Sequence, residues 1–220
     1  MRFLILIIGA YLVGSIPFGL IIARVHGKDL RSIGSGNIGA TNLSRALGRK
    51  WAYLCFCLDV LKGLVPMSTA TALLSSPPDT GQLFLALAVG CAAIAGHIFP
   101  IYVNFRGGKG VATSFGVALG LWPYYTICAL FAIVVWVVVV LLWRYISLAS
   151  IIASIAFPVT LTFVIILMPG WDFAGLWPLL IAASAIPLMV VIRHTGNIKR
   201  ILAGTEGKIL KDRSGTHQER

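Results

Sequence analysis

Residues 111–143 read VATSFGVALGLWPYYTICALFAIVVWVVVVLLW, and the way this stretch folds sets the number of membrane crossings. It has no charged residue, while Arg106 and Lys109 precede it and Arg144 follows it directly. One long helix would place Arg144 across the membrane from Arg106 and Lys109. Two helices, divided near Pro123, return these cations to one side, as the positive-inside rule prefers. We therefore predict two helices here, the first of only about 11 residues, or roughly 17 Å.

The composition is that of an integral membrane protein. Of the 220 residues, 58% are hydrophobic and 11% are charged, whereas charged residues make up about 25% of a soluble domain. With roughly 20 apolar residues for each crossing, the chain has room for six or seven helices and no separate soluble domain. The formal charge of +11 does not indicate nucleic acid, because the basic residues are scattered over loops with few aromatic residues between them. We expect a single membrane-embedded domain over residues 1–220.

Applied to the whole chain, these rules predict an all-α protein with seven transmembrane helices, the N-terminus outside and the C-terminus in the cytoplasm. Loops 26–50 and 106–110 and the tail 193–220 then share the cytoplasmic side. Pro17 is expected to kink the first helix, or to mark where that helix opens. The predicted helices outside 111–143 cover Phe3–Val25, Trp51–Leu74, Leu83–Phe105, Ser147–Met168 and a last segment that ends at Ile192.

Two charged residues fall inside the second predicted helix. Asp59 and Lys62 are three residues apart and therefore lie on one face of that helix. A charge inside the bilayer costs several kcal/mol unless it is paired or hydrated. We predict that the two side chains pair with each other or line a polar cavity.

Three polar segments reach the cytoplasmic face in this topology. The first is Ser35-Gly-Asn-Ile-Gly-Ala-Thr-Asn42, with Arg45 close behind it. The second is Arg106-Gly-Gly-Lys-Gly110, and the third begins at His194. Glycines let backbone N–H groups approach a ligand closely, and beside a cation such groups bind anions, most often phosphate. A flexible cytoplasmic turn whose cations only satisfy the positive-inside rule is an equally good interpretation of the second segment alone.

Several catalytic patterns are missing from the sequence. The glycines around Lys109 do not have the Walker A spacing, and no Gly-x-Ser-x-Gly elbow occurs. No histidine is followed by an aspartate at the spacing of the four-residue-spaced His/Asp acyltransferases. No cluster has metal-ligand spacing, so we expect neither a metal ion nor a cofactor. The pooled cations, amides and glycines suit the binding of phosphate and the stabilisation of charge that develops on oxygen.

The three segments resemble the three cytoplasmic motifs of the bacterial acyl-phosphate:glycerol-3-phosphate acyltransferases, the PlsY family. Arg106 stands where that family usually has lysine, which keeps the charge. Length and motif order agree over nearly the whole chain. The residues that carry the resemblance are Ser35–Asn42, Gly96-His-Ile-Phe-Pro100, Phe105-Arg-Gly-Gly-Lys-Gly-Val-Ala-Thr113, His194-Thr-Gly-Asn-Ile-Lys-Arg200, Gly204-Thr-Glu206 and, in the first helix, Gly14-Ser-Ile-Pro-Phe-Gly19.

The resemblance implies seven helices and the transfer of a fatty acyl group from acyl phosphate to the 1-hydroxyl of glycerol 3-phosphate. The products would be lysophosphatidic acid and phosphate, in the first acylation step of bacterial phospholipid synthesis. The site would face the cytoplasm from the bacterial inner membrane. Besides the two substrates, the expected partners are the lipid bilayer and the soluble enzyme that makes acyl phosphate, and no nucleic acid.

The resemblance also implies roles for individual residues. The expected catalytic residues are Ser35, Asn37, Arg45, His194, Asn197 and Glu206. The expected substrate-binding residues are Thr41, Asn42, His97, Gly107, Gly108, Lys109, Gly110 and Thr113.

We expect the glycerol hydroxyl to attack acyl phosphate directly, without a covalent acyl-enzyme. A mixed anhydride is already activated, so positioning and charge stabilisation suffice. The proton would pass to a substrate phosphate or to His194. The alternative function is a transporter or channel for a phosphorylated or other anionic solute, with Asp59 and Lys62 as its gate. The lack of internal repeats and the crowding of polar residues at one face, away from the midplane, disfavour that alternative.

Overall fold

The computed structural model describes residues 1–209, and this part of the chain is built from helices without any strand. The predicted cytoplasmic tail therefore lies partly, over residues 210–220, outside the described residues. In chain order the elements are α1 (Arg2–Gly14), α2 (Phe18–Val25), α3 (Ala40–Leu47), α4 (Arg49–Thr71), α5 (Thr80–Ile98), the 3₁₀ helix η1 (Ile101–Val103), α6 (Val111–Gly120), α7 (Tyr124–Trp143), α8 (Ile146–Leu167), α9 (Phe173–Arg193) and α10 (Thr195–Leu202).

Six segments of the described chain are long and apolar enough to cross a membrane. They are Arg2–Val25, Arg49–Thr71, Thr80–Val103, Tyr124–Trp143, Ile146–Leu167 and Phe173–Arg193. The all-helical membrane architecture is therefore confirmed. The division of residues 111–143 is also confirmed, because α6 is an apolar helix of 10 residues that ends before α7 begins.

The first predicted span is confirmed as Arg2–Val25, and it is interrupted at Pro17, as expected, which divides it into α1 and α2. Pro17 has no N–H group to donate to the preceding turn, and its φ and ψ of −90° and 70° are not helical. The carbonyl of Ile16 accepts from the N–H of Phe18 at 3.1 Å instead of continuing the α-helical pattern. The break sets a short stretch of non-helical backbone inside the segment Arg2–Val25.

The third predicted helix also ends earlier than expected, at Ile98 instead of Phe105. Pro100 disfavours helical backbone at the residue before it, and Phe99 accordingly has φ −123° and ψ 61°. The chain then turns through η1, and both Asn104 and Phe105 have left-handed backbone, with φ of 55° and 58°. This turn carries the chain to the glycine-rich segment.

Two short helices lie in segments that we predicted as polar loop and tail. α3 falls within loop 26–50 and α10 within the tail. In α3, Leu43 is fully buried and Ala40, Ala46 and Leu47 pack around the same small apolar cluster as α2. A helix this short has few apolar positions, so the flanking polar residues hid its pattern.

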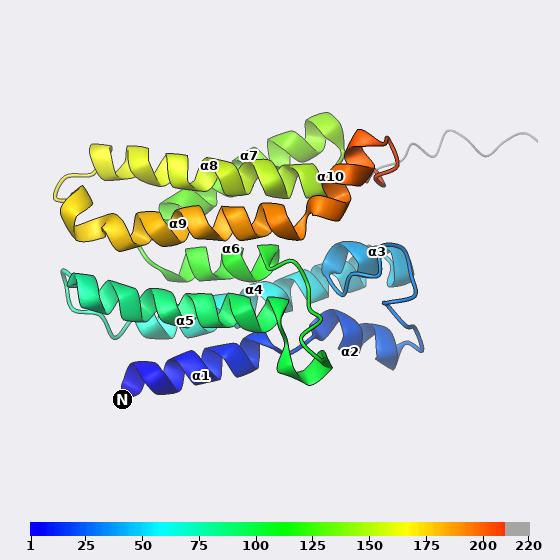
Figure 1. The fold of residues 1–220 in the computed structure, drawn as a ribbon, viewed down its shortest axis with the longest axis horizontal. Helices are drawn as coiled ribbons and strands as arrows, with labels where there is room; N and C mark the ends of the chain where they lie inside the picture. The colour runs from blue at the N-terminus through cyan, green and yellow to red at the C-terminus, as the bar shows by residue number, and fades with distance from the viewer. Residues whose placement is uncertain (210–220) are drawn as a thin grey trace, which may run out of the picture.

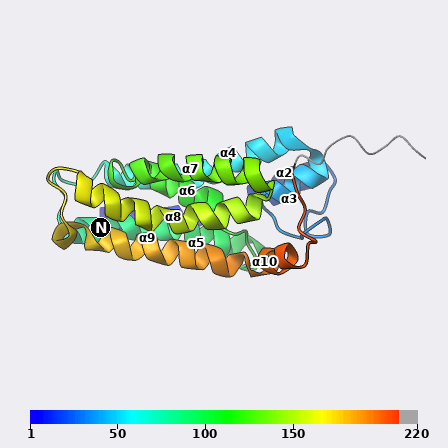
Figure 2. The same ribbon diagram turned by 90° about the horizontal axis from the view of Figure 1, so that it is seen from above.

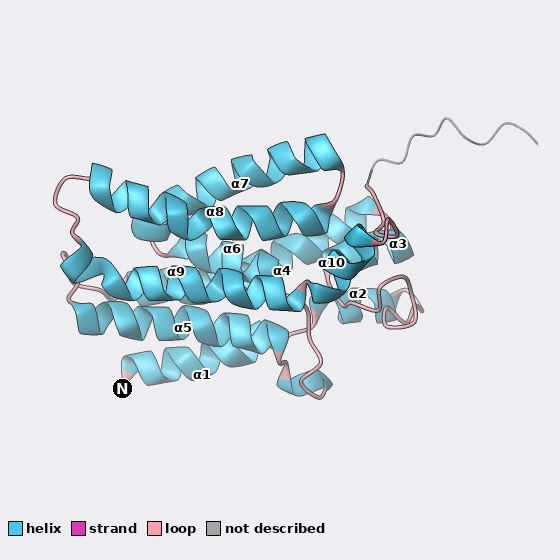
Figure 3. Cartoon of the chain, turned by 45° about the horizontal axis from the view of Figure 1, so that its top comes forward, coloured by secondary structure: helices cyan, strands magenta, loops and turns pink. Residues whose placement is uncertain are grey.

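The helices form two groups that lie side by side (Figures 1 and 3). One group contains α1, α4, α5 and α6, and the other contains α7, α8 and α9. Contacts of α5 with α9 and of α6 with α7 join the groups, and the main apolar core fills the space between them. The short helix α6 is therefore central, and its first turn faces the polar end of the bundle (Figure 1).

The two ends of the bundle differ. Figures 1 and 2 show α2, α3, α10 and the loop that leads into α6 together at one end, while the N-terminus and the short turns lie at the other. At the N-terminal end, Asp79 and Asp172 cap α5 and α9 by accepting from backbone N–H groups at 2.8 and 2.6 Å. The polar segments are thus all placed at one end, where they can form a single site.

Candidate active site

The three polar segments meet, as the sequence predicted. Arg45, from α3, lies beside the tail, because its Nη2 atom is 3.0 Å from the position that a β-carbon on Gly207 would take. Lys109, from the glycine-rich segment, donates a hydrogen bond from Nζ to Oδ1 of Asn197 in α10. The segments are far apart in sequence, so the fold is what brings their cations together.

Asn197 and Glu206 form a fixed support for Lys109. Asn197 donates from Nδ2 to Oε1 of Glu206 at 2.5 Å, which leaves its Oδ1 turned towards Lys109. The same Oε1 accepts from the hydroxyl of Ser147 at 2.7 Å, and Oε2 accepts from Arg200 Nε at 2.7 Å. Burial raises the pKa of Glu206, but these three donors outweigh it and hold the pKa below its ordinary value. Glu206 is therefore an anion whose oxygens are already engaged, and it orients Asn197.

Lys109 is a cation that burial makes easier to deprotonate. The pKa of Lys109 is lowered from 10.5 to about 8, mainly by burial; Arg200, Arg193 and Arg45 act in the same direction, and Glu206 acts against it. Cations that act on Lys109 in this way share a region that is short of negative charge. An anion with more than one charge is the ligand that such a region accommodates.

His194 lies at the junction of α9 and α10 and is buried. Its Nδ1 is 2.8 Å from the carbonyl oxygen of Val190, so Nδ1 carries the proton and Nε2 keeps a lone pair. Burial lowers the pKa of His194 to about 4, and the charge on Lys109 acts in the same direction. The imidazole is neutral near pH 7 and can accept a proton at Nε2.

The glycine-rich segment is held by its own backbone. The N–H groups of Gly107 and Gly108 donate to the carbonyls of Ile98 and His97, both at 3.1 Å. Two of the glycine N–H groups that we expected to bind substrate are therefore occupied within the protein. Over residues 1–209 the structure gives no acceptor to the N–H groups from Lys109 to Thr113, which lead into α6 and form its first turn. The anion-binding donors thus begin at Lys109.

Arg193 contacts the glycine-rich segment, although the sequence did not single it out. Its Nη2 donates to the carbonyl of Gly108 at 2.9 Å and lies 3.5 Å from that of Gly107. It thus ties α9 to the glycine segment from the side opposite to the N–H groups. Its only sequence signal is its place before His194 at the end of a membrane helix, where any cation satisfies the positive-inside rule.

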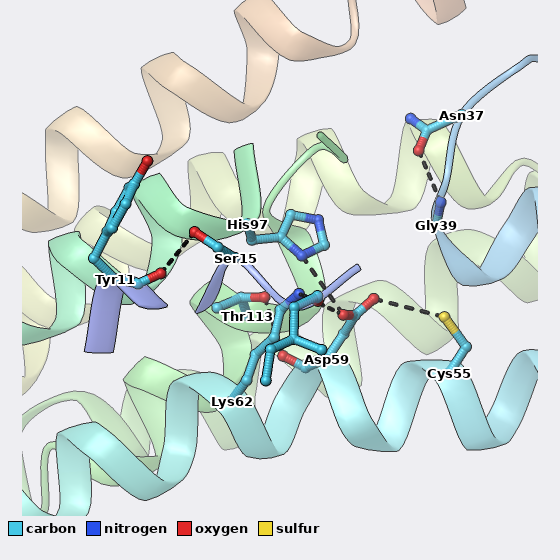
Figure 4. A network of polar contacts seen from close by, with 10 residues as sticks. Tyr11, Ser15, Asn37, Gly39, Cys55, Asp59, Lys62, His97 and Thr113 are labelled. Carbon is cyan, nitrogen blue, oxygen red and sulfur yellow. Dashed lines mark hydrogen bonds and ion pairs between the residues drawn. The ribbon is translucent and has the colours of Figure 1, made fainter. Parts of the chain in front are cut away.

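The first polar segment is a loop organised by Asn42. The side chain of Asn42 is buried, accepts from the N–H of Ser35 at 3.1 Å, and donates to the carbonyls of Leu30 and Ile33 at 3.0 and 2.9 Å. Asn42 therefore shapes the loop, and its amide is used within the protein. Asn37 accepts from the N–H of Gly39 at 2.9 Å (Figure 4).

The remaining candidates of this loop are open to solvent. Ser35, Thr41 and Arg45 are exposed. Within the described residues, the hydroxyl of Ser35 has no acidic or imidazole partner that could act as its base.

A second polar cluster lies inside the bundle, around Asp59 (Figure 4). Asp59 Oδ1 is 2.8 Å from Lys62 Nζ and 3.6 Å from His97 Nδ1, and all three side chains are buried. This confirms the predicted pairing of Asp59 with Lys62. Lys62 also donates to the carbonyl of Ile16 at the break between α1 and α2, at 3.0 Å.

Two expected substrate-binding residues belong to this buried cluster. His97 points to Asp59, and the hydroxyl of Thr113, which is fully buried, donates to the carbonyl of Asp59 at 3.0 Å. A cavity beside the cluster, bordered by the α1–α2 break, has room for about one water molecule. No group of three or more potential metal ligands occurs in the described chain.

The chain resembles proteins of one family over nearly its whole length. The family model described as glycerol-3-phosphate acyltransferase matches residues 4–204. A glycerol-3-phosphate acyltransferase of Trichlorobacter lovleyi is 45% identical over 202 residues, covering 92% of this chain and 95% of that protein. The glycerol-3-phosphate acyltransferase of Aquifex aeolicus is 41% identical over 206 residues, covering 94% and 98%.

Solved structures agree with these relatives. A crystal structure of PlsY (YgiH), an integral membrane glycerol 3-phosphate acyltransferase in its glycerol 3-phosphate form, superposes with a TM-score of 0.83 at 40% identity and covers 95% of this chain and 96% of that one. The lysophosphatidic acid form of the same protein gives a TM-score of 0.80 at 39% identity, with 94% and 95% covered.

Proposed function

This chain belongs to the glycerol-3-phosphate acyltransferase family, and we propose that it acylates glycerol 3-phosphate with acyl phosphate as the donor. The products are lysophosphatidic acid and inorganic phosphate. The observation that carries the proposal is the joining of Lys109, through Asn197, to Glu206 beside the free N–H groups at the start of α6. That arrangement supports the binding of a phosphate that must leave with negative charge.

The site offers cations for two phosphorylated molecules. We assign Lys109 and the N–H groups that begin α6 to acyl phosphate, because a helix N-terminus and a cation together stabilise a leaving phosphate. We assign Arg45 to the phosphate of glycerol 3-phosphate, since it comes from the opposite polar segment and is exposed. Ser35, Asn37 and Thr41, on the same loop, offer short polar groups to the glycerol moiety.

The reaction needs no nucleophile from the protein. The oxygen of the 1-hydroxyl attacks the carbonyl carbon of acyl phosphate, the bond from that carbon to the phosphate oxygen breaks, and the electron pair leaves on phosphate. The hydroxyl proton passes to a substrate phosphate or to Nε2 of His194, which is neutral and unprotonated near pH 7. Ser35 is a hydrogen-bond donor in this scheme.

We also propose the orientation of the protein. With α6 counted as a short crossing, the chain crosses the membrane seven times, with the N-terminus outside and the polar end in the cytoplasm of a bacterial inner membrane. The gathering of basic segments at that end supports this orientation. A cytoplasmic site can receive acyl phosphate from the soluble enzyme that makes it.

The experiment uses the purified protein in lipid vesicles. Glycerol 3-phosphate is supplied with acyl phosphate, acyl-CoA or acyl carrier protein thioester, and lysophosphatidic acid and phosphate are both measured. We expect turnover with acyl phosphate alone, with one phosphate released for each product molecule. Turnover with a thioester instead would refute the donor.

A second measurement tests the direct mechanism. The protein is incubated with acyl phosphate labelled in the acyl chain while glycerol 3-phosphate is withheld, and the protein is then analysed by mass spectrometry. We expect no acyl adduct, because Ser35 has no base beside it in the described structure. An acyl-enzyme that disappears when glycerol 3-phosphate is added would overturn direct attack.

A further inference from the structure

The buried cluster of Asp59, Lys62 and His97 has no part in the reaction as written above, yet burying its charged groups costs free energy. Ionised groups within a membrane segment are costly unless each is paired. Asp59 and Lys62 are each only 4% exposed, and they lie within the segment Arg49–Thr71. A role that depends on their charge and geometry would account for their presence.

The cluster reaches the glycine segment through His97. The carbonyl of His97 accepts from the N–H of Gly108, and the imidazole lies against the α-carbon of Gly108. A β-carbon at Gly108 would overlap Nε2 of His97, so the ring and the glycine backbone are in direct contact. On the other side of the ring, Oδ1 of Asp59 faces Nδ1 at 3.6 Å, which is close packing and longer than a hydrogen bond. The imidazole is therefore confined between Asp59 and the glycine backbone, and a change at Asp59 can shift the segment before Lys109.

The cluster also reaches the start of α6 through Thr113. The hydroxyl of Thr113 donates to the backbone carbonyl of Asp59 at 3.0 Å, and Gly63 packs directly against the carbonyl of Thr113. The free N–H groups of the proposed anion site belong to this same turn. One turn of α4 thus contacts both sides of Lys109, namely the segment before it and the helix after it.

We infer that Asp59 is a positioning residue for acyl phosphate: with Lys62 and His97 it fixes the glycine segment and the first turn of α6 so that Lys109 and the free N–H groups point at one anion. Lys62 contributes by neutralising the charge of Asp59 and by donating a hydrogen bond to the carbonyl of Ile16 at the break between α1 and α2. This inference rests on the proposed function, because it names the substrate that the positioned groups bind.

The main test removes both charges together. Asp59→Asn alone would leave Lys62 buried and unpaired, so the variant is Asp59→Asn/Lys62→Met, which keeps the volumes similar and leaves no buried charge. Ile16 keeps its hydrogen bond from Phe18 in this variant. We expect the KM for acyl phosphate to rise about tenfold or more, while the KM for glycerol 3-phosphate stays within about twofold.

A matched pair of threonine variants provides the second test, at the two ends of α6. Thr113→Val removes the bond to Asp59, and Thr126→Val removes a 2.9 Å bond to the carbonyl of Leu119 at the other end of the helix. Both hydroxyls are buried, so the two substitutions lose equivalent bonds. We expect Thr113→Val to raise the KM for acyl phosphate about fivefold and Thr126→Val to leave it unchanged.

The outcomes separate the inference from its alternatives. A purely structural cluster would lower kcat in proportion to the folded fraction, measured by size-exclusion chromatography after heating, and leave both KM values unchanged; that result overturns the inference. If Asp59→Asn/Lys62→Met does not fold, the threonine pair decides, and equal KM values for acyl phosphate in the two variants refute it. If the unmodified protein does not turn over acyl phosphate, the proposed function itself fails.

Discussion

At the scale of single residues, Lys109 is the group whose environment matters most. In the proposed site it must be charged to hold a phosphate, but burial and three neighbouring arginines lower its pKa to about 8. Asn197 gives it a neutral acceptor, and Glu206 supplies the compensating negative charge one residue further away. This spacing leaves Lys109 free to exchange its protein partner for a substrate oxygen, which a direct ion pair with Glu206 would hinder.

The pKa of Lys109 leads to a prediction about pH. Lys109 is protonated below about pH 8 and loses its charge above it. We therefore expect kcat/KM for acyl phosphate, which reports the free enzyme, to fall as the pH rises through about 8. In Lys109→Arg the charge persists at every accessible pH, so the fall should be absent even if the maximum is lower. The measurement is initial rate at low acyl phosphate between about pH 6 and pH 9.5.

Ionisation of the substrates affects the unmodified protein and Lys109→Arg equally. The ratio of their kcat/KM values therefore reports only the ionisation of Lys109. A ratio that does not change across this range would show that the deprotonation of Lys109 is not what limits activity at high pH.

The sequence predicted which residues meet, but not what each one does. Arg45, Lys109 and Asn197 converge, as the predicted topology required of their segments. By contrast, the hydrogen bonds of Asn42 and of the glycine N–H groups depend on loop geometry, which no periodicity encodes. Arg193 escaped notice because its charge and position suit a helix end whether or not it binds anything.

At the scale of elements, the packing of α4 against α6 is what holds the site in place. Gly116 of α6 lies directly against the carbonyl of Val60, and a β-carbon there would also be 2.9 Å from the N–H nitrogen of Leu64. Gly63 and Gly120 make similar close approaches between the same two helices. Small residues let membrane helices approach this closely, and the close approach brings Thr113 within reach of Asp59.

We predict that Gly116→Ala destabilises the protein by about 1–3 kcal/mol, because its methyl group must push α4 and α6 apart. Gly9→Ala is the control, since Gly9 also lies in a membrane helix but has nothing within 4 Å of the added carbon. The midpoint of thermal unfolding in detergent should fall for Gly116→Ala and stay level or rise slightly for Gly9→Ala. Equal unfolding midpoints for the two variants would mean that α4 and α6 can move apart to accept the methyl group without loss of stability, and would contradict the prediction.

The helices could be predicted from hydropathy and charge, and so could the interruptions at Pro17 and near Pro123, whereas the early end of α5 could not. The division falls at Pro123, as predicted, and α6 has 10 residues, close to its predicted length. The break before α2 and the early end of α5 both depend on a proline, but Pro66, Pro158 and Pro187 lie inside continuous helices. Proline alone is therefore an ambiguous signal. At the break before α2, the carbonyl of Ile16 accepts from Nζ of Lys62, which lies 46 positions further along the chain.

At the scale of the whole molecule, the main feature is that the two ends of the bundle differ, with the polar segments at one end and the N-terminus at the other. The N-terminus lies at the end opposite to α10, so the path between them crosses the bundle an odd number of times (Figure 1). Six long segments give an even number, which supports the proposal that α6 makes the seventh crossing although it has only 10 residues. α6 is short because its first turn starts below the polar end, where the glycine segment enters.

This asymmetry predicts the sides from which single cysteines can be labelled. The four native cysteines are first replaced by alanine, and Ser32→Cys, Ser76→Cys and Leu202→Cys are introduced one at a time at exposed positions. In sealed right-side-out vesicles a membrane-impermeant maleimide should label Ser76→Cys at once, because the turn between α4 and α5 faces outwards in the proposed orientation. Ser32→Cys and Leu202→Cys should react only after the vesicles are opened, or in inverted vesicles. Activity retained by each variant shows that the labelled protein is native. If Ser32→Cys and Ser76→Cys reacted from the same side, α4 would not cross the bilayer, and the two phosphate-binding segments could not share one cytoplasmic site.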